Sequence, residues 1–178
     1  MKLTNHIFEK KFIKNYNLEI NPHIAVAVSG GPDSMALVHL ISFFSKKINA
    51  KIIALVVNHN LRTESKNEVN WVSNKLESMN INYKILNVSK KKLIKRNMEE
   101  ARNNRYKKLL SYCKKYKILH LCIAHHYDDI IETYLLRKLS GSNFYGLRSM
   151  QNITVKDNIC ILRPLLDFNK TQIVNYNL

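Results

Sequence analysis

The stretch IAVAVSGGPDS, residues 24–34, decides the fold of this chain. Residues 24–28 are apolar throughout and rich in β-branched side chains, which is typical of a strand buried on both faces of a sheet. The residues that follow form a turn with two glycines. Pro32 then suits the first turn of a helix, because its missing N–H costs no hydrogen bond there. The stretch therefore predicts a buried strand, a tight loop and a helix in direct succession.

The loop at residues 29–34 has the properties of an anion-binding loop. Gly30 and Gly31 allow positive φ and lack a Cβ, so the backbone can wrap closely around an oxyanion. The free N–H groups at the start of the next helix face the same anion, and Ser29 and Ser34 add hydroxyl donors. The loop is not a Walker A loop, because the GK[ST] ending and its lysine are absent. An ordinary tight turn is the alternative interpretation.

Asp33 is the unusual residue of this loop. A carboxylate next to bound phosphates repels them unless a divalent cation lies between the two. The loop therefore predicts a Mg²⁺ site at Asp33. Helix capping by the same carboxylate is the alternative, since the helix dipole favours an acidic residue in the first turn.

The rest of the chain repeats the alternation of strand and helix. Apolar runs at 52–57, 83–88, 118–124 and 159–162 predict further strands, and stretches with a period near 3.6 at 3–16, 34–44, 68–79, 99–116 and 128–139 predict helices. We therefore expect a single α/β domain over residues 1–178. Its fold would be a Rossmann-like, doubly wound parallel sheet of about five strands with helices on both faces. Ligands of such sheets bind at the carboxyl ends of the strands, where the strand order reverses.

Composition narrows the class of protein. The net charge is +16, from 29 Lys and Arg against 13 Asp and Glu, which favours a polyanionic partner such as nucleic acid. Codon bias toward Lys, Asn and Ile explains the same surplus without such a partner. The three cysteines form no CxxC pair, so neither a disulfide framework nor a zinc ribbon is indicated. Without a signal peptide or a membrane-length apolar run, we expect a cytoplasmic protein.

A second polar cluster, AHHYDDIIET at residues 124–133, follows the apolar run 118–124. The helix dipole accounts for Asp128 or Asp129 in a first turn, but it does not account for two adjacent histidines at the end of a strand. A zinc site is the weaker alternative, because neither HExxH nor CxxC is present. We expect Asp129 to share a Mg²⁺ ion with Asp33.

These motifs carry a family resemblance. The loop SGGPDS matches the SGGxDS signature of the PP-loop ATP pyrophosphatases. Five more segments resemble the tRNA(Ile)-lysidine synthetase family in the same order: VNHNLR (57–62), EARNNRY (100–106), AHHYDDIIET (124–133), RKLSGSNFYGLRSM (137–150) and RPLL (163–166). The resemblance covers residues 23–178. Asn58 replaces the usual Asp, and Asn143 and Ser149 replace glycines. Members of the family continue beyond the RPLL segment into tRNA-binding domains, so the resemblance implies a catalytic domain truncated before them.

The resemblance implies ATP-dependent ligation of free lysine to C2 of the wobble cytidine in an isoleucine tRNA with a CAU anticodon. An adenylated base would be the intermediate, and AMP and pyrophosphate would be released. The implied ligands are ATP and Mg²⁺. The implied site residues are Ser29, Gly30, Gly31, Pro32, Asp33 and Ser34 for pyrophosphate, His59 and Arg62 for the nucleotide, Asp33 and Asp129 for Mg²⁺, and His125 and Arg105 for catalysis.

Other interpretations stay open. A tRNA thiolase of the same superfamily would need a sulfur carrier or CxxC ligands, and an amidotransferase would need an ammonia-generating domain. A remnant that binds ATP or tRNA without catalysis is the third alternative. Arg102 and Arg105 are equally compatible with a solvated basic stripe, and His125 with a structural role. The basic run 90–96 fits a tRNA contact or a solubilising surface loop, and the oligomeric state is not readable. Aromatic residues at helical positions, namely Phe43, Phe44, Trp71, Tyr112 and Tyr116, are expected in the core.

Overall fold

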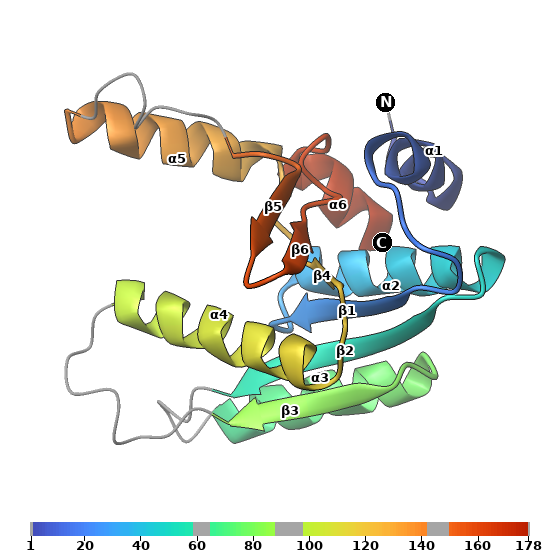
Figure 1. Cartoon of the computed structure of the whole chain (residues 1–178). Coiled ribbons are helices and arrows are strands. Elements are labelled where there is room, and N and C mark those ends of the chain that lie inside the picture. The colour runs from blue at the N-terminus through green and yellow to red at the C-terminus, as the bar shows by residue number, and fades with distance from the viewer. Residues whose placement is uncertain (1, 59–64, 88–97, 142–149, 178) are drawn as a thin grey trace.

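The structure is a computed structural model, and it describes residues 2–58, 65–87, 98–141 and 150–177. The described residues form one six-stranded sheet with the order β3-β2-β1-β4-β6-β5. Its strands are β1 (His23–Val28), β2 (Lys51–Asn58), β3 (Tyr83–Asn87), β4 (His120–Cys122), β5 (Ile153–Lys156) and β6 (Ile159–Leu162). Every neighbouring pair is parallel except β5 and β6. Figure 1 shows the sheet with β5 at one edge.

The five strands expected from the sequence are all present, and they are mutually parallel as predicted. The additional strand, β5, pairs antiparallel with β6. All four of its residues are exposed, so it lacks the buried apolar run that marks β1, β2, β4 and β6.

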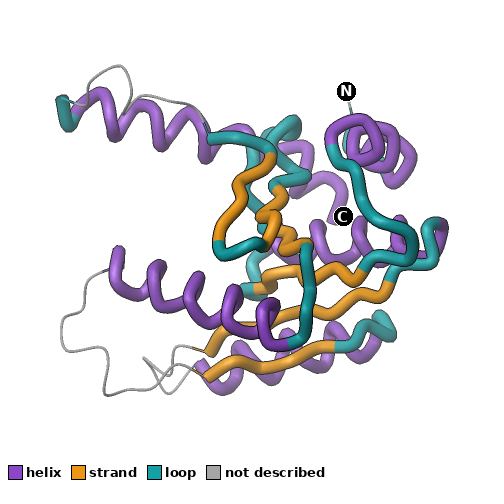
Figure 2. The backbone as a smooth tube through the Cα atoms, viewed as in Figure 1, coloured by secondary structure: helices purple, strands orange, loops and turns teal. Residues whose placement is uncertain are grey.

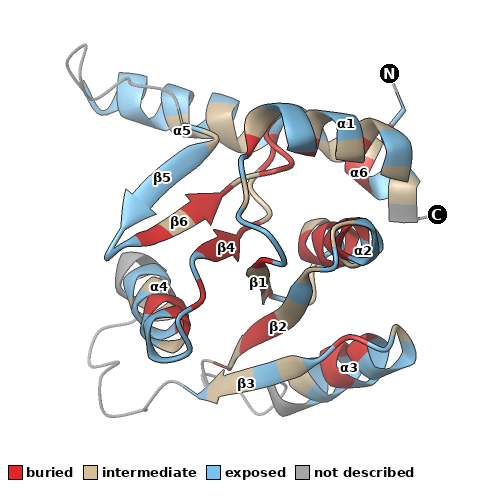
Figure 3. Ribbon diagram, turned by 45° about the vertical axis from the view of Figure 1, so that its right-hand side comes forward, coloured by how far each residue is buried: buried red, intermediate tan, exposed pale blue. Residues whose placement is uncertain are grey.

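In the described part of the chain, six helices surround the sheet: α1 (Asn5–Asn15), α2 (Pro32–Lys47), α3 (Ser65–Ser78), α4 (Met98–Lys115), α5 (Tyr127–Leu139) and α6 (Lys170–Asn177). One buried cluster joins Ile24 and Val26 of β1 to α1, α2, α3 and α6. A second cluster on the opposite face joins Ala25 to Leu109 and Cys113 of α4. The alternation along β1 thus sends successive side chains to opposite faces, and helices cover both of them, as expected (Figures 2 and 3).

The strand order reverses between β1 and β4. From β1 the chain builds outward through β2 to β3, then returns along α4 to β4 on the other side of β1. Val26 therefore pairs with Ala54 on one side and Cys122 on the other. The switch point lies at the carboxyl ends of β1 and β4, where such sheets bind ligands.

The aromatic residues expected in the core differ in part from that expectation. Phe44 is buried, but Trp71 is 55% exposed, and Phe43 and Tyr116 are also exposed rather than in the core. Phe43 and Trp71 lie outside the stripe that their helices bury against the sheet, and Tyr116 lies in the turn after α4. Helix α5 has no buried residue and projects away from the sheet (Figure 1).

Candidate functional site

The loop at residues 29–34 leaves β1 and enters α2 as the sequence predicts. Gly30 has a φ of 86°, and a Cβ placed on it would lie 2.7 Å from Cγ2 of Val72 on α3. Gly31 differs from expectation, because its φ is −69° and it is the N-cap residue of α2. An N-cap residue adopts extended backbone angles, so only Gly30 requires the left-handed conformation.

Serine hydroxyl groups hold the loop in shape. The buried Ser34 accepts a hydrogen bond at Oγ from the Ser29 N–H at 3.1 Å and donates one to the Gly31 carbonyl oxygen at 2.9 Å. The Ser29 hydroxyl also donates to Ser34 Oγ at 3.3 Å. In this structure the Ser34 hydroxyl therefore fixes the loop itself.

Asp33, in the first turn of α2, lies between two cationic or potentially cationic side chains. The Lys170 ammonium donates to both of its carboxylate oxygens, at 2.7 and 2.6 Å. Nε2 of His126 lies 3.8 Å from Oδ2 of Asp33. Lys170 and His126 were not among the residues selected from the sequence.

The second polar cluster lies at the tip of β4. His126 is the N-cap residue of α5, and its backbone N–H donates to the Asp129 carboxylate at 2.8 Å. Nδ1 of the same histidine lies 3.5 Å from Asp128 and 3.6 Å from Asp129. His126 thus lies between Asp33, which follows β1, and the acidic pair Asp128 and Asp129, which follows β4. The two motifs meet at the same edge of the sheet, as the sequence predicts.

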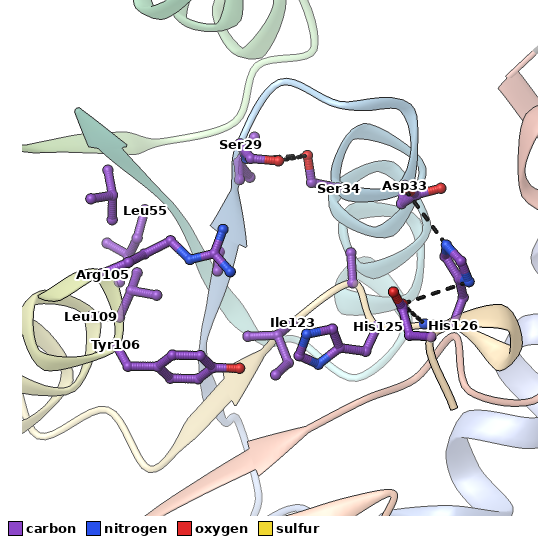
Figure 4. A pocket seen from close by; sticks show the side chains of 15 residues that line it. Ser29, Asp33, Ser34, Leu55, Arg105, Tyr106, Leu109, Ile123, His125 and His126 are labelled. Carbon is purple, nitrogen blue, oxygen red and sulfur yellow. Dashed lines mark hydrogen bonds and ion pairs between the residues drawn. The ribbon is translucent and has the colours of Figure 1, made fainter. Parts of the chain in front are cut away.

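Both motifs line one pocket of about 290 Å³ (Figure 4). The polar part of its lining comes from Ser29, Asp33, Ser34, Arg105, His125, His126 and Asp129. The apolar part comes from Ala27, Val28, Leu55, Val57, Leu109, Ile123 and Ala124, with Tyr106 beside them. A pocket with apolar walls and a few convergent polar groups suits a ligand that has both a flat ring and charged groups.

His125 is neutral at physiological pH. Burial lowers its pKa to about 4; Asp129 opposes this shift, while Arg163, Arg102 and Arg105 reinforce it. Its Nδ1 atom is buried and has no hydrogen-bond partner among the residues that the structure describes. A neutral imidazole with a free ring nitrogen can donate or accept a hydrogen bond, but it cannot act as a cation.

The two arginines of α4 differ in position. Arg105 lines the pocket, and its side chain points toward the loop at residues 29–34 (Figure 4). Arg102 is exposed and is not part of the lining. Arg105 therefore does not belong to a solvated basic stripe, which was the alternative that its spacing from Arg102 allowed.

The described residues are compatible with a Mg²⁺ ion of the kind that usually binds beside phosphates. Both oxygens of Asp33 already hold a cation, the Lys170 ammonium, and Asp129 lines the same pocket. Among residues 2–58, 65–87, 98–141 and 150–177, no three His, Cys, Asp or Glu side chains cluster as a metal cage. Mg²⁺ commonly takes one or two carboxylates and completes its shell with water and substrate phosphates.

Several predicted elements lie outside the described residues. They are His59 and Arg62, the basic run 90–96, and the segment 142–149. Within the described part of the chain, no helix has the length and apolar character needed to cross a membrane.

The fold and the pocket define a nucleotide-binding α/β domain of the PP-loop type. The comparison with family models agrees, since the PP-loop domain model matches residues 4–177. The chain belongs to the PP-loop domain family.

Curated relatives refine the comparison. The chain is 42% identical over 158 residues to the tRNA(Ile)-lysidine synthase of Wolbachia sp. subsp. Brugia malayi (strain TRS), with 88% of the chain and 37% of the relative covered. It is 37% identical over 158 residues to that of Orientia tsutsugamushi (strain Boryong), covering 89% of the chain and 36% of the relative. The chain thus spans little more than a third of these relatives.

Solved structures share the fold. The U34-tRNA thiolase NcsA from Methanococcus maripaludis, solved with its [4Fe-4S] cluster, superimposes with a TM-score of 0.79 at 20% identity, covering 96% of this chain and 62% of that one. The Candida glabrata FMN adenylyltransferase gives a TM-score of 0.56 at 14% identity, covering 97% and 55%. At these identities the likeness concerns the fold alone.

Proposed function

We propose that this chain is the ATP-binding catalytic domain of a tRNA(Ile)-lysidine synthase, and that it acts in the cytoplasm. The reaction would join free lysine to C2 of the wobble cytidine in an isoleucine tRNA with a CAU anticodon. The relatives carry this name, and the six sequence motifs agree with it. The observation that carries the proposal is the meeting of the 29–34 loop and the tip of β4 around one pocket.

The reaction that fits the pocket has two displacements. The cytidine carbonyl oxygen attacks the α-phosphorus of ATP, and pyrophosphate leaves. The lysine amine then attacks C2 of the adenylated base, and AMP leaves with the oxygen. Both steps need aligned reactants and stabilisation of negative charge on phosphoryl oxygens more than they need a strong acid or base.

The residues of the pocket would have different roles in this reaction. The backbone of the 29–34 loop and the start of α2 would bind the pyrophosphate part of ATP. Arg105 would bind an anionic oxygen or the target base from the opposite wall. His125, which is neutral, would hydrogen-bond the base or the carboxylate of lysine, and so help to orient the reactants.

Asp33 and Asp129 would hold Mg²⁺ against the phosphates, where a divalent cation neutralises charge on the leaving pyrophosphate. His59 and Arg62, which lie outside the described residues, would bind the nucleotide.

A thiolase activity is less compatible with the chain. Its cysteines lie apart in the sequence, and Cys113 and Cys122 are buried. Burial raises the pKa of the Cys113 thiol to about 12, so at neutral pH it carries almost no reactive thiolate.

A single-turnover assay tests the proposal. The protein, in the form that the cell makes, is mixed with α-labelled ATP, and AMP is measured with and without lysine and with and without the tRNA. We expect AMP only when both are present. Sulfide-dependent turnover without lysine would establish a thiolase instead, and ATP binding without AMP formation would indicate a non-catalytic remnant.

A further inference from the structure

Both the backbone and the side chain of Lys170 are held by hydrogen bonds. Its ammonium contacts both oxygens of Asp33, which is 137 residues away in the sequence. Its backbone N–H donates to Asp128 at 2.7 Å. Asn169 and Gln172 exchange backbone-to-side-chain hydrogen bonds of 2.9 Å, which cap the start of α6. The ammonium is thus directed at the loop at residues 29–34 by a helix end that is itself fixed to α5.

This ion pair is not required to attach α6 to the rest of the fold. Phe168 and Ile173 are fully buried against the core. Tyr176 contacts His39 Nδ1 at 2.6 Å and donates to Asn5 at 2.6 Å. The Asp33–Lys170 pair is also partly exposed, at 24% and 43% of the side-chain surface, so it contributes little to stability.

The contact has a consequence for metal binding. An ammonium that contacts both carboxylate oxygens occupies the position from which a divalent cation would bind both of them, and its positive charge repels the cation. Metal and ammonium therefore compete for Asp33. A displaced ammonium at this position lies beside the loop where the phosphates would bind, and it can pair with their oxygens.

We propose, as an extension of the proposed function, that Lys170 occupies the metal position on Asp33 until metal and nucleotide bind. When metal and nucleotide arrive, its ammonium moves from Asp33 to the pyrophosphate group. Lys170 is then a binding residue for pyrophosphate as well as a competitor of the metal. Before the ligand binds, the Lys170 ammonium lies next to the Asp33 carboxylate. After the exchange, it lies next to the phosphate oxygens.

Two binding titrations without tRNA or lysine test this exchange. Free Mn²⁺ is measured by electron paramagnetic resonance, and inorganic pyrophosphate binding by calorimetry. For Lys170→Ala we expect Mn²⁺ to bind about threefold more tightly or better, and pyrophosphate about fivefold more weakly or worse. Lys170→Arg should retain most of the pyrophosphate affinity.

A matched control and a double variant complete the design. Lys11→Ala removes a lysine that pairs with Asp167 at 3.0 Å with similar exposure, so it should leave both affinities unchanged. In an Asp33→Asn background, Lys170→Ala should no longer change Mn²⁺ affinity. Unchanged Mn²⁺ or pyrophosphate affinity in Lys170→Ala would overturn the exchange. Neither titration depends on which nucleophile attacks ATP, so this failure is distinguishable from a failure of the lysidine assay.

Discussion

Replacing Gly30 with alanine tests how the loop at residues 29–34 is built. At a φ of 86° an L-residue is strained by about 1–2 kcal/mol. The new methyl group would also lie 2.7 Å from Cγ2 of Val72, whereas carbon atoms pack at about 3.5–4.0 Å. Val72 is buried on α3, so its displacement adds about 1–3 kcal/mol of overpacking. We expect Gly30→Ala to lower the free energy of unfolding by about 3 kcal/mol.

Gly31→Ala is the matched control. Its φ of −69° suits any L-residue, and its Cβ would meet only Ser29 Oγ at 3.7 Å, an ordinary contact. Loss of a favourable N-cap residue should cost no more than about 1 kcal/mol. Val72→Ala, introduced into Gly30→Ala, should relieve the collision but leave the backbone strain. The double-mutant cycle should therefore show a favourable coupling of about 1 kcal/mol or more.

Urea denaturation followed by circular dichroism measures all four variants, and it avoids the fluorescence of Trp71, which neighbours Val72. Equal destabilisation by Gly30→Ala and Gly31→Ala would refute the assignment of strain to Gly30. Strict additivity of Gly30→Ala and Val72→Ala would refute the collision.

Three further predictions concern the pocket. Asp33→Asn should abolish AMP formation while leaving the free energy of unfolding within about 1 kcal/mol of wild type, because a partly exposed ion pair stabilises little; near-normal AMP formation would contradict the metal role. Arg105→Ala should weaken tRNA-dependent steps about tenfold more than ATP binding, and equal losses would contradict its contact with the tRNA. His125→Gln should reduce the loss of stability at acid pH. In the wild type the unfolded histidine takes up a proton near pH 6.5, while the folded one resists protonation down to about pH 4, so its contribution is complete above pH 6.5 and disappears as the pH falls toward 4. Urea titrations at pH 7.5 and 5.0 should show the wild type losing about 2 kcal/mol more than the variant, and parallel losses would exclude the buried neutral imidazole.

The order of strands and helices was predictable because residues 24–28 and the runs like them are apolar on both faces. Parallel strands buried in this way have a pattern that helices do not share. The exposed residues 153–156 of β5 have no such pattern, and their pairing depends on β6. Trp71 was misassigned because helical spacing alone does not show which stripe faces the sheet.

The site residues were predictable where a residue type is unusual for the sequence around it. Two glycines before a helix, and two histidines before an acidic turn, both stand out in the sequence. Lys170 does not, since it is one of 29 Lys and Arg residues, and its contact with Asp33 depends on packing between segments 137 residues apart. His126 was visible in the motif, but its place between Asp33 and Asp129 required the geometry of two strand tips.

The arrangement of β1 beside β4 also bears on how the protein matures. The loop at residues 29–34 and the tip of β4 form two halves of the pocket and are separated in the chain by β2, α3, β3 and α4, so an N-terminal fragment that ends before β4 cannot assemble it. A ligand that needs both halves binds only chains in which β4 has paired with β1, and it stabilises that state by mass action. Nucleotide would then act as a late folding ligand, protecting chains in which the long-range strand pairing has closed and giving no protection to those in which it has not.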